Sequence, residues 1–573
     1  MVSLSVDPLL QDLGLLVVRE AASACARRLN ASLRRLAGLI ETAADDLLAT
    51  PGDLHPGRAD EAIEIYAGAF RFAGQLVETR GRSVFALHPP SRAWARELHA
   101  FEWLRHLAAA DTPVSRLNAR ALVDDWLVLD ASDRLPRLAW EAETAARRLQ
   151  SWLSHAPLYL DRADAAFRAR LLAAITRHVG RLTRFVRQDS GTLAGIRVAS
   201  ALLSASIAVP AFRRHQVAAL RRLDVELRRQ VLLDGGHLSR NPAAIAEVLA
   251  EILPLRDALA GLGRPASAAM MNSIDRMMPM LRFFQLGEAG LAHFHGAGVI
   301  DEALMACVLA ADDSGGSAHG NAPHSGYQRL QSGTTALIID CGPPPPPAVA
   351  GEAHASCLAF EFASRANRFV VNCGHAAAHL PDWQAAGRAT AAHSTLAIAE
   401  TSSARVIERG LMARLLGRTL IGGPRHVPVE RREHAGSTAV TARHDGYASR
   451  FGLTHERTIR LEAGGGRIDG RDRLEALRRG DDPLPATPSA PHPYHVRFHL
   501  APAIRPHALD SGVVMLMAPD GETWEFRAED SIPYVEASIY LADPAGPCRT
   551  EQIVLDGLAC DRPEQRWSFT RVR

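Results

Sequence analysis

The chain has 573 residues, more than a single hydrophobic core usually holds, so two or more domains are expected. Its formal net charge of +2 is close to neutral for this size and argues against a dedicated nucleic-acid-binding protein. All 65 basic residues are arginine, which excludes Schiff-base and lysine-base catalysis. The seven cysteines are scattered and odd in number, so they predict neither a disulfide framework nor a zinc knuckle, and a reducing compartment is the simpler expectation.

The N-terminal segment does not resemble a signal peptide, because it lacks a basic region before its apolar residues and carries Asp7, Asp12 and Glu20 among them. No run of about 18 apolar residues occurs, so no transmembrane helix is expected. A cytoplasmic location is the resulting prediction.

Helical periodicity dominates the first half of the chain. Up to about residue 290 the sequence is rich in Ala, Leu and Arg, and its apolar residues recur at spacings of three and four. We predict an all-helical domain over residues 1–310, built from helix pairs with short connections, as an incomplete (α/α) toroid or a solenoid requires. No repeat of fixed length is evident.

A Gly/Ser/His-rich segment at residues 311–326 is the predicted linker or domain boundary. From residue 327 to 573 the apolar runs are short, alternating and bounded by Gly, Pro, Asp or Asn, which predicts an antiparallel β-sandwich or super-sandwich. The proline run at residues 343–347 cannot donate backbone hydrogen bonds. It is either a stiff spacer between strands or, as the alternative, a site for a proline-recognising partner.

Three polar residues fall at the ends of predicted strands between residues 351 and 396. A period of two would put His354 on the same face as Phe360, while Asn372 ends one apolar run and His393 begins another. Strand ends open into loops, where sites usually form, so the three side chains can converge. The alternative is that each is a structural hydrogen-bonding residue.

These motifs resemble the heparinase II/III-like family of polysaccharide lyases. The resemblance rests on HASCLAFE, VVNCG and RATAAHST in the second half, together with DGGHLSRNP and HDGY, and extends from about residue 95 onward. It implies a helical toroid and a β domain that form a cleft for an acidic polysaccharide. It also implies cleavage by β-elimination, in which a base takes a proton beside a uronate carboxylate and an acid protonates the leaving oxygen.

The resemblance also implies a divalent metal, zinc, in the β domain. By motif position His354 and His393 match the two metal-binding histidines, and Asn372 stands where the family has Asp. A neutral amide is a weaker zinc ligand than a carboxylate, so a metal-free hydrogen-bonded cluster is the alternative.

The chain departs from the family at the residues that move protons. Glu352 stands where the family has a catalytic histidine, Ala244 where it has a tyrosine base, and its Asn-His pair is missing. The remaining candidates for proton transfer and for substrate binding lie in loops, several beside a helix N-terminus that favours anions. The proton-transfer candidates are His237, Tyr327, Glu352 and Tyr447, and the substrate-binding candidates are Arg240, Asn241, Arg388 and His444.

Two functions therefore stay open. One is a lyase that acts on a uronate-containing polysaccharide. The other is a catalytically degenerate protein that binds glycan or assists envelope assembly. The family resemblance allows a periplasmic location besides the cytoplasmic one, and the sugar and the oligomeric state are not predicted.

Overall fold

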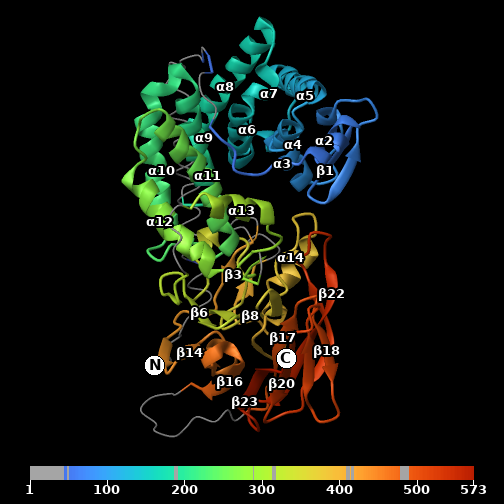
Figure 1. The fold of residues 1–573 in the computed structure, drawn as a ribbon, viewed down its shortest axis with the longest axis vertical. Helices are drawn as coiled ribbons and strands as arrows, with labels where there is room; N and C mark the ends of the chain where they lie inside the picture. Colours follow the sequence, from blue (N-terminus) through green and yellow to red (C-terminus); the bar gives the residue numbers. More distant parts are fainter. Residues whose placement is uncertain are drawn as a thin grey trace.

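The chain folds into a helical part followed by a β part, stacked along the long axis of the molecule (Figure 1). The computed structural model describes residues 51–185, 191–287, 290–312, 318–407, 418–477 and 490–572, with isolated positions at 14, 44, 46, 47 and 413. A helical region followed by antiparallel sheets is the predicted fold class, and it is confirmed.

The helical part is built around α9, which packs against α6, α10 and α11. α9 is buried on nearly all sides and carries small residues, with alanines and serines in RVASALLSASIA that let its neighbours approach closely. The helices are α2 (Ala59–Tyr66), α3 (Arg92–Ala100), α4 (Leu104–Ala110), α5 (Pro113–Ala131), α6 (Ala142–Ser154), α7 (Ala156–Leu160), α8 (Ala165–Phe185), α9 (Leu193–Ala208), α10 (Gln216–Gln230), α11 (Pro242–Gly261), α12 (Ala268–Phe283) and α13 (Glu302–Ala310).

The prediction of an all-helical first domain is wrong in one respect, because two short hairpins interrupt the helices. β1 (Ala69–Phe72) pairs with β2 (Gln75–Glu78), and β3 (Gln285–Leu286) pairs with β4 (Gly290–Leu291). Ala73 and Gly74 both have positive φ, as a two-residue turn between twisted strands requires. The alternating AFRF and QLVE segments on either side then form a hairpin that helical periodicity does not reveal.

The β part consists of two large antiparallel sheets. The first has the order β21-β22-β17-β9-β8-β7-β6-β5, with β10 also paired to β17, and the second has the order β13-β14-β15-β16-β23-β20-β19-β18. The first sheet comprises β5 (Asn321–Ala322), β6 (Tyr327–Ser332), β7 (Thr335–Asp340), β8 (Phe360–Ser364), β9 (Asn367–Val371), β10 (Leu396–Ile398), β17 (Pro493–Leu500), β21 (Tyr534–Tyr540) and β22 (Cys548–Leu558). The second comprises β13 (Val429–His434), β14 (Ser437–His444), β15 (Leu453–Leu461), β16 (Arg467–Ala476), β18 (Arg505–Ala508), β19 (Val514–Met517), β20 (Thr523–Ala528) and β23 (Glu564–Arg571).

Smaller elements connect these sheets. They are the strand pair β11 (Arg405–Val406) and β12 (Leu420–Ile421), and the short helices α14 (Pro381–Gly387) and α16 (Ala448–Phe451). The last helix of the helical part, α13, ends at Ala310, and β6 begins at Tyr327. β5 lies inside the segment 311–326 that was predicted as a linker.

Aromatic side chains hold the two sheets together. Phe360 of the first sheet stacks on Trp567 of the second at a centroid distance of 5.5 Å, and Phe498 meets the same indole edge-on at 4.9 Å. The opposite face of the first sheet is buried as well, because Ile338 and Ala363 belong to the hydrophobic core of the helical part. The first sheet is therefore covered on both faces, and β8 is buried along its whole length.

The row of alternating residues predicted from His354 to Phe360 is not a continuous strand. Residues 351–359 form turns and irregular backbone, and β8 begins only at Phe360. Leu358 has positive φ, which breaks the extended conformation just before the strand. His354 consequently lies in a buried loop.

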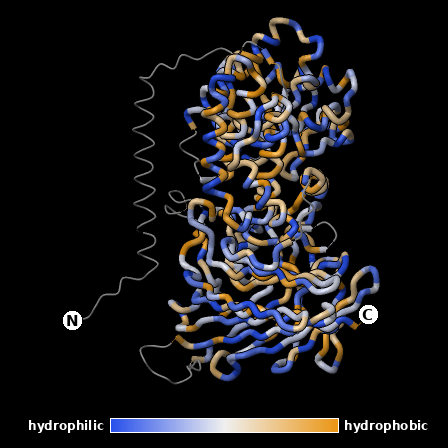
Figure 2. The backbone as a smooth tube through the Cα atoms, turned by 60° about the vertical axis from the view of Figure 1, so that its left-hand side comes forward, coloured by the Kyte–Doolittle hydropathy of each residue, from blue (hydrophilic) through white to orange (hydrophobic). Residues whose placement is uncertain are grey.

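Hydropathy along the backbone follows this architecture, since strands at the base alternate between hydrophobic and hydrophilic residues (Figure 2). In the described part of the chain, no helix combines the length and apolar character needed to cross a bilayer.

Candidate functional site

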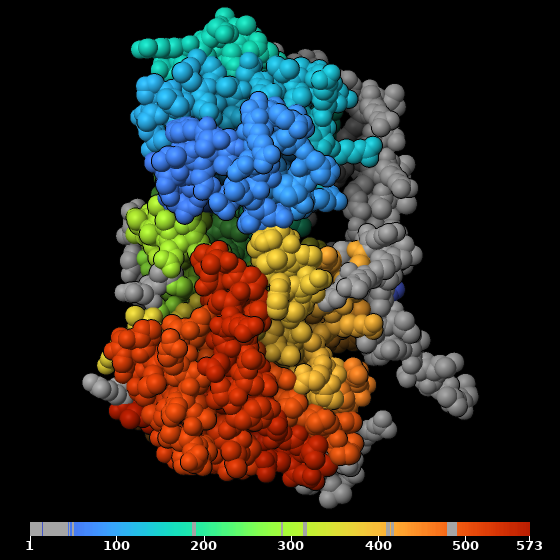
Figure 3. Space-filling model, turned by 90° about the vertical axis from the view of Figure 1, so that its right-hand side faces the viewer, coloured from blue at the N-terminus to red at the C-terminus, as the bar shows by residue number. Residues whose placement is uncertain are grey.

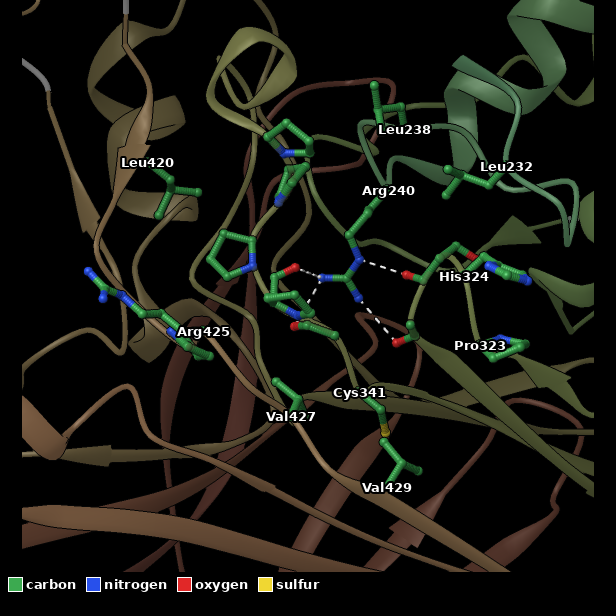
Figure 4. A pocket seen from close by; sticks show the side chains of 18 of the residues that line it. Leu232, Leu238, Arg240, Pro323, His324, Cys341, Leu420, Arg425, Val427 and Val429 are labelled. Atoms are coloured by element: carbon green, nitrogen blue, oxygen red, sulfur yellow. Dashed lines mark hydrogen bonds between the residues drawn. The ribbon is translucent and has the colours of Figure 1, made fainter. Parts of the chain in front are cut away.

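Arg240 joins the helical part to the β part. Its guanidinium donates hydrogen bonds to the carbonyls of Ser325 (2.7 Å) and Pro343 (2.8 Å), among others, and forms an ion pair with buried Asp340 (Figure 4). It also lies 4.7 Å over the ring of Tyr327, whose hydroxyl donates to the Arg240 carbonyl at 2.7 Å. Nε and both terminal nitrogens are thus engaged, so Arg240 has no N–H group to offer a substrate carboxylate.

Tyr327 is equally unavailable as an acid or base. The side chain is fully buried, and burial raises its pKa well above the ordinary value. Arg240 and Tyr327 were both predicted to act on substrate. In the structure they instead bind each other and connect the start of α11 to β6, and this contact is called the clamp.

His237 and Asn241 stabilise the loop and the helix that follow. His237 accepts hydrogen bonds at Nδ1 from Ser239 and contacts Gln230 Oε1 through Nε2 at 3.1 Å, and burial lowers its pKa to about 4. Asn241 is the N-cap of α11, where Oδ1 accepts from the Ala243 amide at 2.9 Å. Both residues have structural partners for the groups that were predicted to act on substrate.

His354 and His393 do come together, as predicted, and His375 extends the pair into a chain. His354 Nδ1 lies 3.0 Å from His393 Nε2, and His354 Nε2 lies 3.3 Å from His375 Nδ1. His393 Nδ1 must donate to the Ala389 carbonyl at 2.7 Å, because a carbonyl only accepts. His354 must then donate to His393, and His375 must donate to His354.

Burial keeps the three histidines neutral, as this order of donors requires. Burial lowers the pKa of His354 well below its ordinary value and the pKa of His375 and His393 to about 4. His375 Nε2 is left to accept from the Gln384 amide at 3.3 Å. Each ring therefore donates once and accepts once.

The predicted metal trio does not fit a zinc ion in this arrangement. Asn372 Oδ1 accepts from the Ser394 amide at 3.0 Å, and its Nδ2 donates to the His293 carbonyl at 3.1 Å. The lone pairs of His354 and His393 already accept hydrogen bonds from neighbouring rings. Across the described ranges, no three His, Cys, Asp or Glu side chains are grouped as metal ligands.

Arg388 holds the loop that carries His354. Its guanidinium donates to the carbonyls of Ala353 (2.8 Å), Arg418 (2.9 Å) and Ala350 (3.1 Å), and the side chain is buried. These three hydrogen bonds hold the backbone of the loop in place. Arg388 therefore has a structural role, whereas it was predicted to bind substrate.

His444 and Tyr447 also meet each other, but inside the β part. The Tyr447 hydroxyl donates to the Leu396 carbonyl at 2.8 Å, and burial raises the pKa of this tyrosine. His444 accepts from the Gly446 amide at Nδ1, and its Nε2 contacts His455, which in turn contacts Asp472 at 2.7 Å. This second chain is buried in the core of the β part.

Glu352 is the predicted proton-transfer residue that keeps an exposed side chain. Partial desolvation and the nearby carboxylates of Glu247 and Glu143 raise its pKa, while Arg197 and Arg388 oppose the shift. Glu352 thus faces the helical part across the junction. It is the one predicted catalytic group with access to solvent.

Figure 3 shows a hollowed band between the helical and β parts. Three cavities of about 640, 210 and 50 Å³ lie in the helical part, with Ala378 as the one described lining residue from the β part, and together they are called the cleft here. Eight carboxylates and four guanidiniums line the three cavities together. The carboxylates are Asp53, Glu97, Glu102, Glu141, Glu143, Glu247, Glu251 and Asp301, and the guanidiniums are those of Arg96, Arg105, Arg147 and Arg197.

The arginines of the cleft are paired with these carboxylates. Arg197 forms ion pairs with Glu143 and Glu247, and Arg147 bonds Glu102 at 2.9 Å and Glu143 at 3.1 Å. Burial, opposed in part by Arg197, raises the pKa of Glu251. The cleft is therefore net negative.

Sequence reasoning missed this network and part of the histidine chain. Arg197 lies on α9 and Glu247 on α11, 50 residues apart, so no local pattern connects them. His375 was identifiable only as the histidine directly after VVNCG. His295, in the segment HFH, bonds Asp340 at 3.1 Å and would have been found by the same search for histidine pairs.

The fold places this chain in one structural class with the solved heparinase lyases. Heparinase III superposes with a TM-score of 0.67 at 12% identity, with 98% of this chain and 91% of that chain covered. Heparan sulfate lyase HepC from Pedobacter heparinus gives 0.60 at 14% identity, with coverages of 91% and 85%. These identities establish the fold alone.

The family follows from sequence. A family model described as heparinase II/III-like, C-terminal matches residues 315–570, and the chain belongs to the heparinase II/III-like family. FtsZ-localized protein C from Caulobacter vibrioides (strain NA1000 / CB15N) is 33% identical over 539 residues, which cover 92% of this chain and 91% of that protein.

Proposed function

We propose that this chain is a heparinase-fold binding protein that has lost β-elimination and localises with FtsZ, since its Caulobacter relative is named an FtsZ-localized protein. One observation carries the loss of catalysis. Of the four predicted proton-transfer residues, His237, Tyr327 and Tyr447 are buried with their polar atoms bonded to the protein itself.

The chemistry of β-elimination explains why this matters. The base must reach a proton beside the uronate carboxylate, and the acid must reach the leaving oxygen, each within about 3 Å. A buried tyrosine with a raised pKa that donates to a carbonyl can do neither. Ala244, at the position of the family's tyrosine base, cannot move a proton.

The charge of the cleft supports the same proposal. A polysaccharide that carries a carboxylate on each uronate needs cations along its path. This cleft offers twice as many carboxylates as guanidiniums, and its arginines already have partners. Repulsion therefore disfavours the acidic polysaccharide that the family resemblance implied.

Association with FtsZ can be tested directly. The full chain is incubated with polymerised FtsZ and centrifuged, and its localisation is followed beside labelled FtsZ in cells. We expect the chain to pellet with the polymer and to overlap FtsZ in the cell. A chain that stays in the supernatant and spreads evenly contradicts the proposal. A cytoplasmic location belongs to this proposal.

Glu352 favours a second candidate function, a lyase with a carboxylate base. Its exposed carboxyl and raised pKa suit a general base that faces the cleft. This candidate requires that the wild-type chain form unsaturated uronate product and that Glu352→Gln abolish it. A matched change at Asp301→Asn, on the rim of the same cleft, should then leave the activity in place.

A further inference from the structure

Two cavities of the cleft adjoin and form one small site. Their volumes are about 210 Å³ and 50 Å³, and four lining residues, His55, Glu102, Arg147 and Glu251, belong to both cavities. The two together are called the inner cavity here. Helices α6, α9, α11 and α13 supply most of its walls. None of the residues predicted to act on a polysaccharide lines it, so it needs its own explanation.

One wall of the inner cavity is aliphatic. It is formed by the side chains of Ala243, Ala246, Val299, Ile300 and Leu304. The described lining residues include no Trp, Tyr or Phe, so the inner cavity offers neither an aromatic cage for a quaternary ammonium nor a ring on which a sugar stacks. The aliphatic wall instead suits the methylene groups of a ligand.

Carboxylates outnumber guanidiniums around the inner cavity. The carboxylates are those of Asp53, Glu102, Glu247, Glu251 and Asp301, and the guanidiniums are those of Arg105, Arg147 and Arg197. Each guanidinium already pairs with a carboxylate of this set. With His55 neutral, two negative charges remain once the three guanidiniums are counted against the carboxylates. The inner cavity therefore favours a ligand with positive charge.

Glu251 lacks a close cationic partner although its side chain is only 14% exposed. Its one described ion pair, with Arg197 Nε, is long at 3.8 Å, and its other oxygen accepts from the neutral amide of Gln150 at 2.5 Å. Burial raises the pKa of Glu251, as expected for a carboxylate whose charge is not fully compensated. A cation beside Glu251 would supply the missing compensation.

Ser204 is a second polar group without a partner. It lines the smaller cavity together with Glu251, and only 3% of the residue is exposed. Within the described part of the chain, its hydroxyl makes no hydrogen bond. A buried hydroxyl is costly to leave unpaired, and its oxygen can accept a hydrogen bond from a ligand. Ser204 and Glu251 thus offer acceptors to a donor that enters this cavity.

From these observations we propose that the inner cavity binds a short aliphatic diamine. One ammonium donates to Glu251 and Ser204, the methylene groups pack on the aliphatic wall, and the second ammonium lies beside Glu247. A primary ammonium has three N–H donors, so it can serve a carboxylate and a hydroxyl together.

The geometry favours this ligand over two other cations. Across the described ranges, no three His, Cys, Asp or Glu side chains are grouped closely enough to bind a metal ion. A lysine side chain of a peptide carries the same ammonium, but the inner cavity is smaller than a groove for an extended chain.

The test is isothermal titration of the full chain with putrescine at low ionic strength, where charge pairing is least screened. We expect saturable binding that weakens at least tenfold with Glu251→Gln and at least threefold with Ser204→Ala. Glu529→Gln, at a carboxylate 67% exposed in the β part, is the matched control and should bind as the wild type does. Thermal melts of all variants confirm that each is folded.

Three other probes decide between the cations. Butylamine, which has one ammonium, should bind at least tenfold more weakly than putrescine. The proposal is overturned if putrescine shows no saturable binding or if Glu251→Gln binds it like the Glu529→Gln control. It is also overturned if magnesium chloride or a capped lysine amide binds as tightly as putrescine, since the site would then not select a free diamine.

Discussion

At the scale of single residues, the histidines and arginines expected to act on a substrate instead satisfy one another and the backbone. His354 and His393 donate and accept within the protein, and Arg240 spends its donors on carbonyls and Asp340. Buried polar groups of this kind are costly to leave unpaired. Their first effect is on stability, which gives three predictions.

Acidification should destabilise the protein below about pH 6.5. Burial lowers the pKa of His237 and His393 to about 4, so between that value and 6.5 the unfolded chain binds more protons than the folded chain. Stability from these groups is fully present above the unfolded pKa and is lost as pH falls toward the folded pKa. Each of the two histidines should therefore lower the free energy of unfolding by about 2 kcal/mol between pH 7 and pH 5. Urea unfolding across this range checks the sign, and a midpoint that rises on acidification would contradict it.

Removing Arg240 should weaken the attachment of the two parts. Arg240→Ala leaves the buried carboxylate of Asp340 without its ion-pair partner and removes hydrogen bonds to carbonyls between residues 325 and 343. The free energy of unfolding should therefore fall by about 3–5 kcal/mol. Arg80→Ala, at a side chain that is 86% exposed, should change the free energy of unfolding by less than about 0.5 kcal/mol. If Arg240→Ala and Arg80→Ala changed the free energy of unfolding in urea equally, Arg240 would not hold the two parts together.

Removal of divalent metal should leave the fold unchanged, because the histidine lone pairs already accept hydrogen bonds. Thermal melting with and without a chelator measures this, and zinc is added back as the control. A chelator that lowers the melting midpoint by several degrees, with recovery on zinc addition, would restore the metal site predicted from the family resemblance.

At the scale of elements, the loop before α11 has a structural role, whereas the family resemblance implied that its residues act on a substrate. Asn241 caps the helix, Pro242 occupies its first position, and Arg240 takes a left-handed backbone conformation just before them. This geometry directs the Arg240 side chain across the junction. The segment therefore has a structural role in this chain.

The cap itself is testable. Asn241→Ala removes the acceptor for the Ala243 amide and should cost about 1 kcal/mol, whereas Asn241→Ser should recover most of it. Chemical denaturation of the two variants beside the wild type measures both effects. If serine were no better than alanine, a role for Asn241 outside capping would be indicated.

Much of the fold was predictable at this scale because periodicity is local. The switch from helical spacing to alternation placed the β part correctly, and His354 and His393 were expected as neighbours. The β1–β2 hairpin was missed because two four-residue strands carry little pattern. The irregular segment at residues 351–359 was taken as strand because alternation does not reveal the positive φ of Leu358.

At the scale of the whole molecule, two hollows differ in their charged residues. The cleft in the helical part is lined by an excess of carboxylates, and a groove of about 1040 Å³ beside the prolines at residues 343–347 has no aspartate or glutamate among its described lining residues. Neither could be predicted from sequence, since each gathers residues from segments far apart in the chain. A net charge near zero also gives no sign of either charge distribution.

The most direct test of the account is whether the chain cleaves uronate polysaccharides at all. The wild-type protein is incubated with heparan sulfate, heparin, hyaluronan and alginate, and the ultraviolet absorbance of unsaturated product is followed, with heparinase III as the positive control. We expect no rise above buffer with any substrate. A rise that scales with protein concentration and disappears with Glu352→Gln would contradict it and establish the lyase.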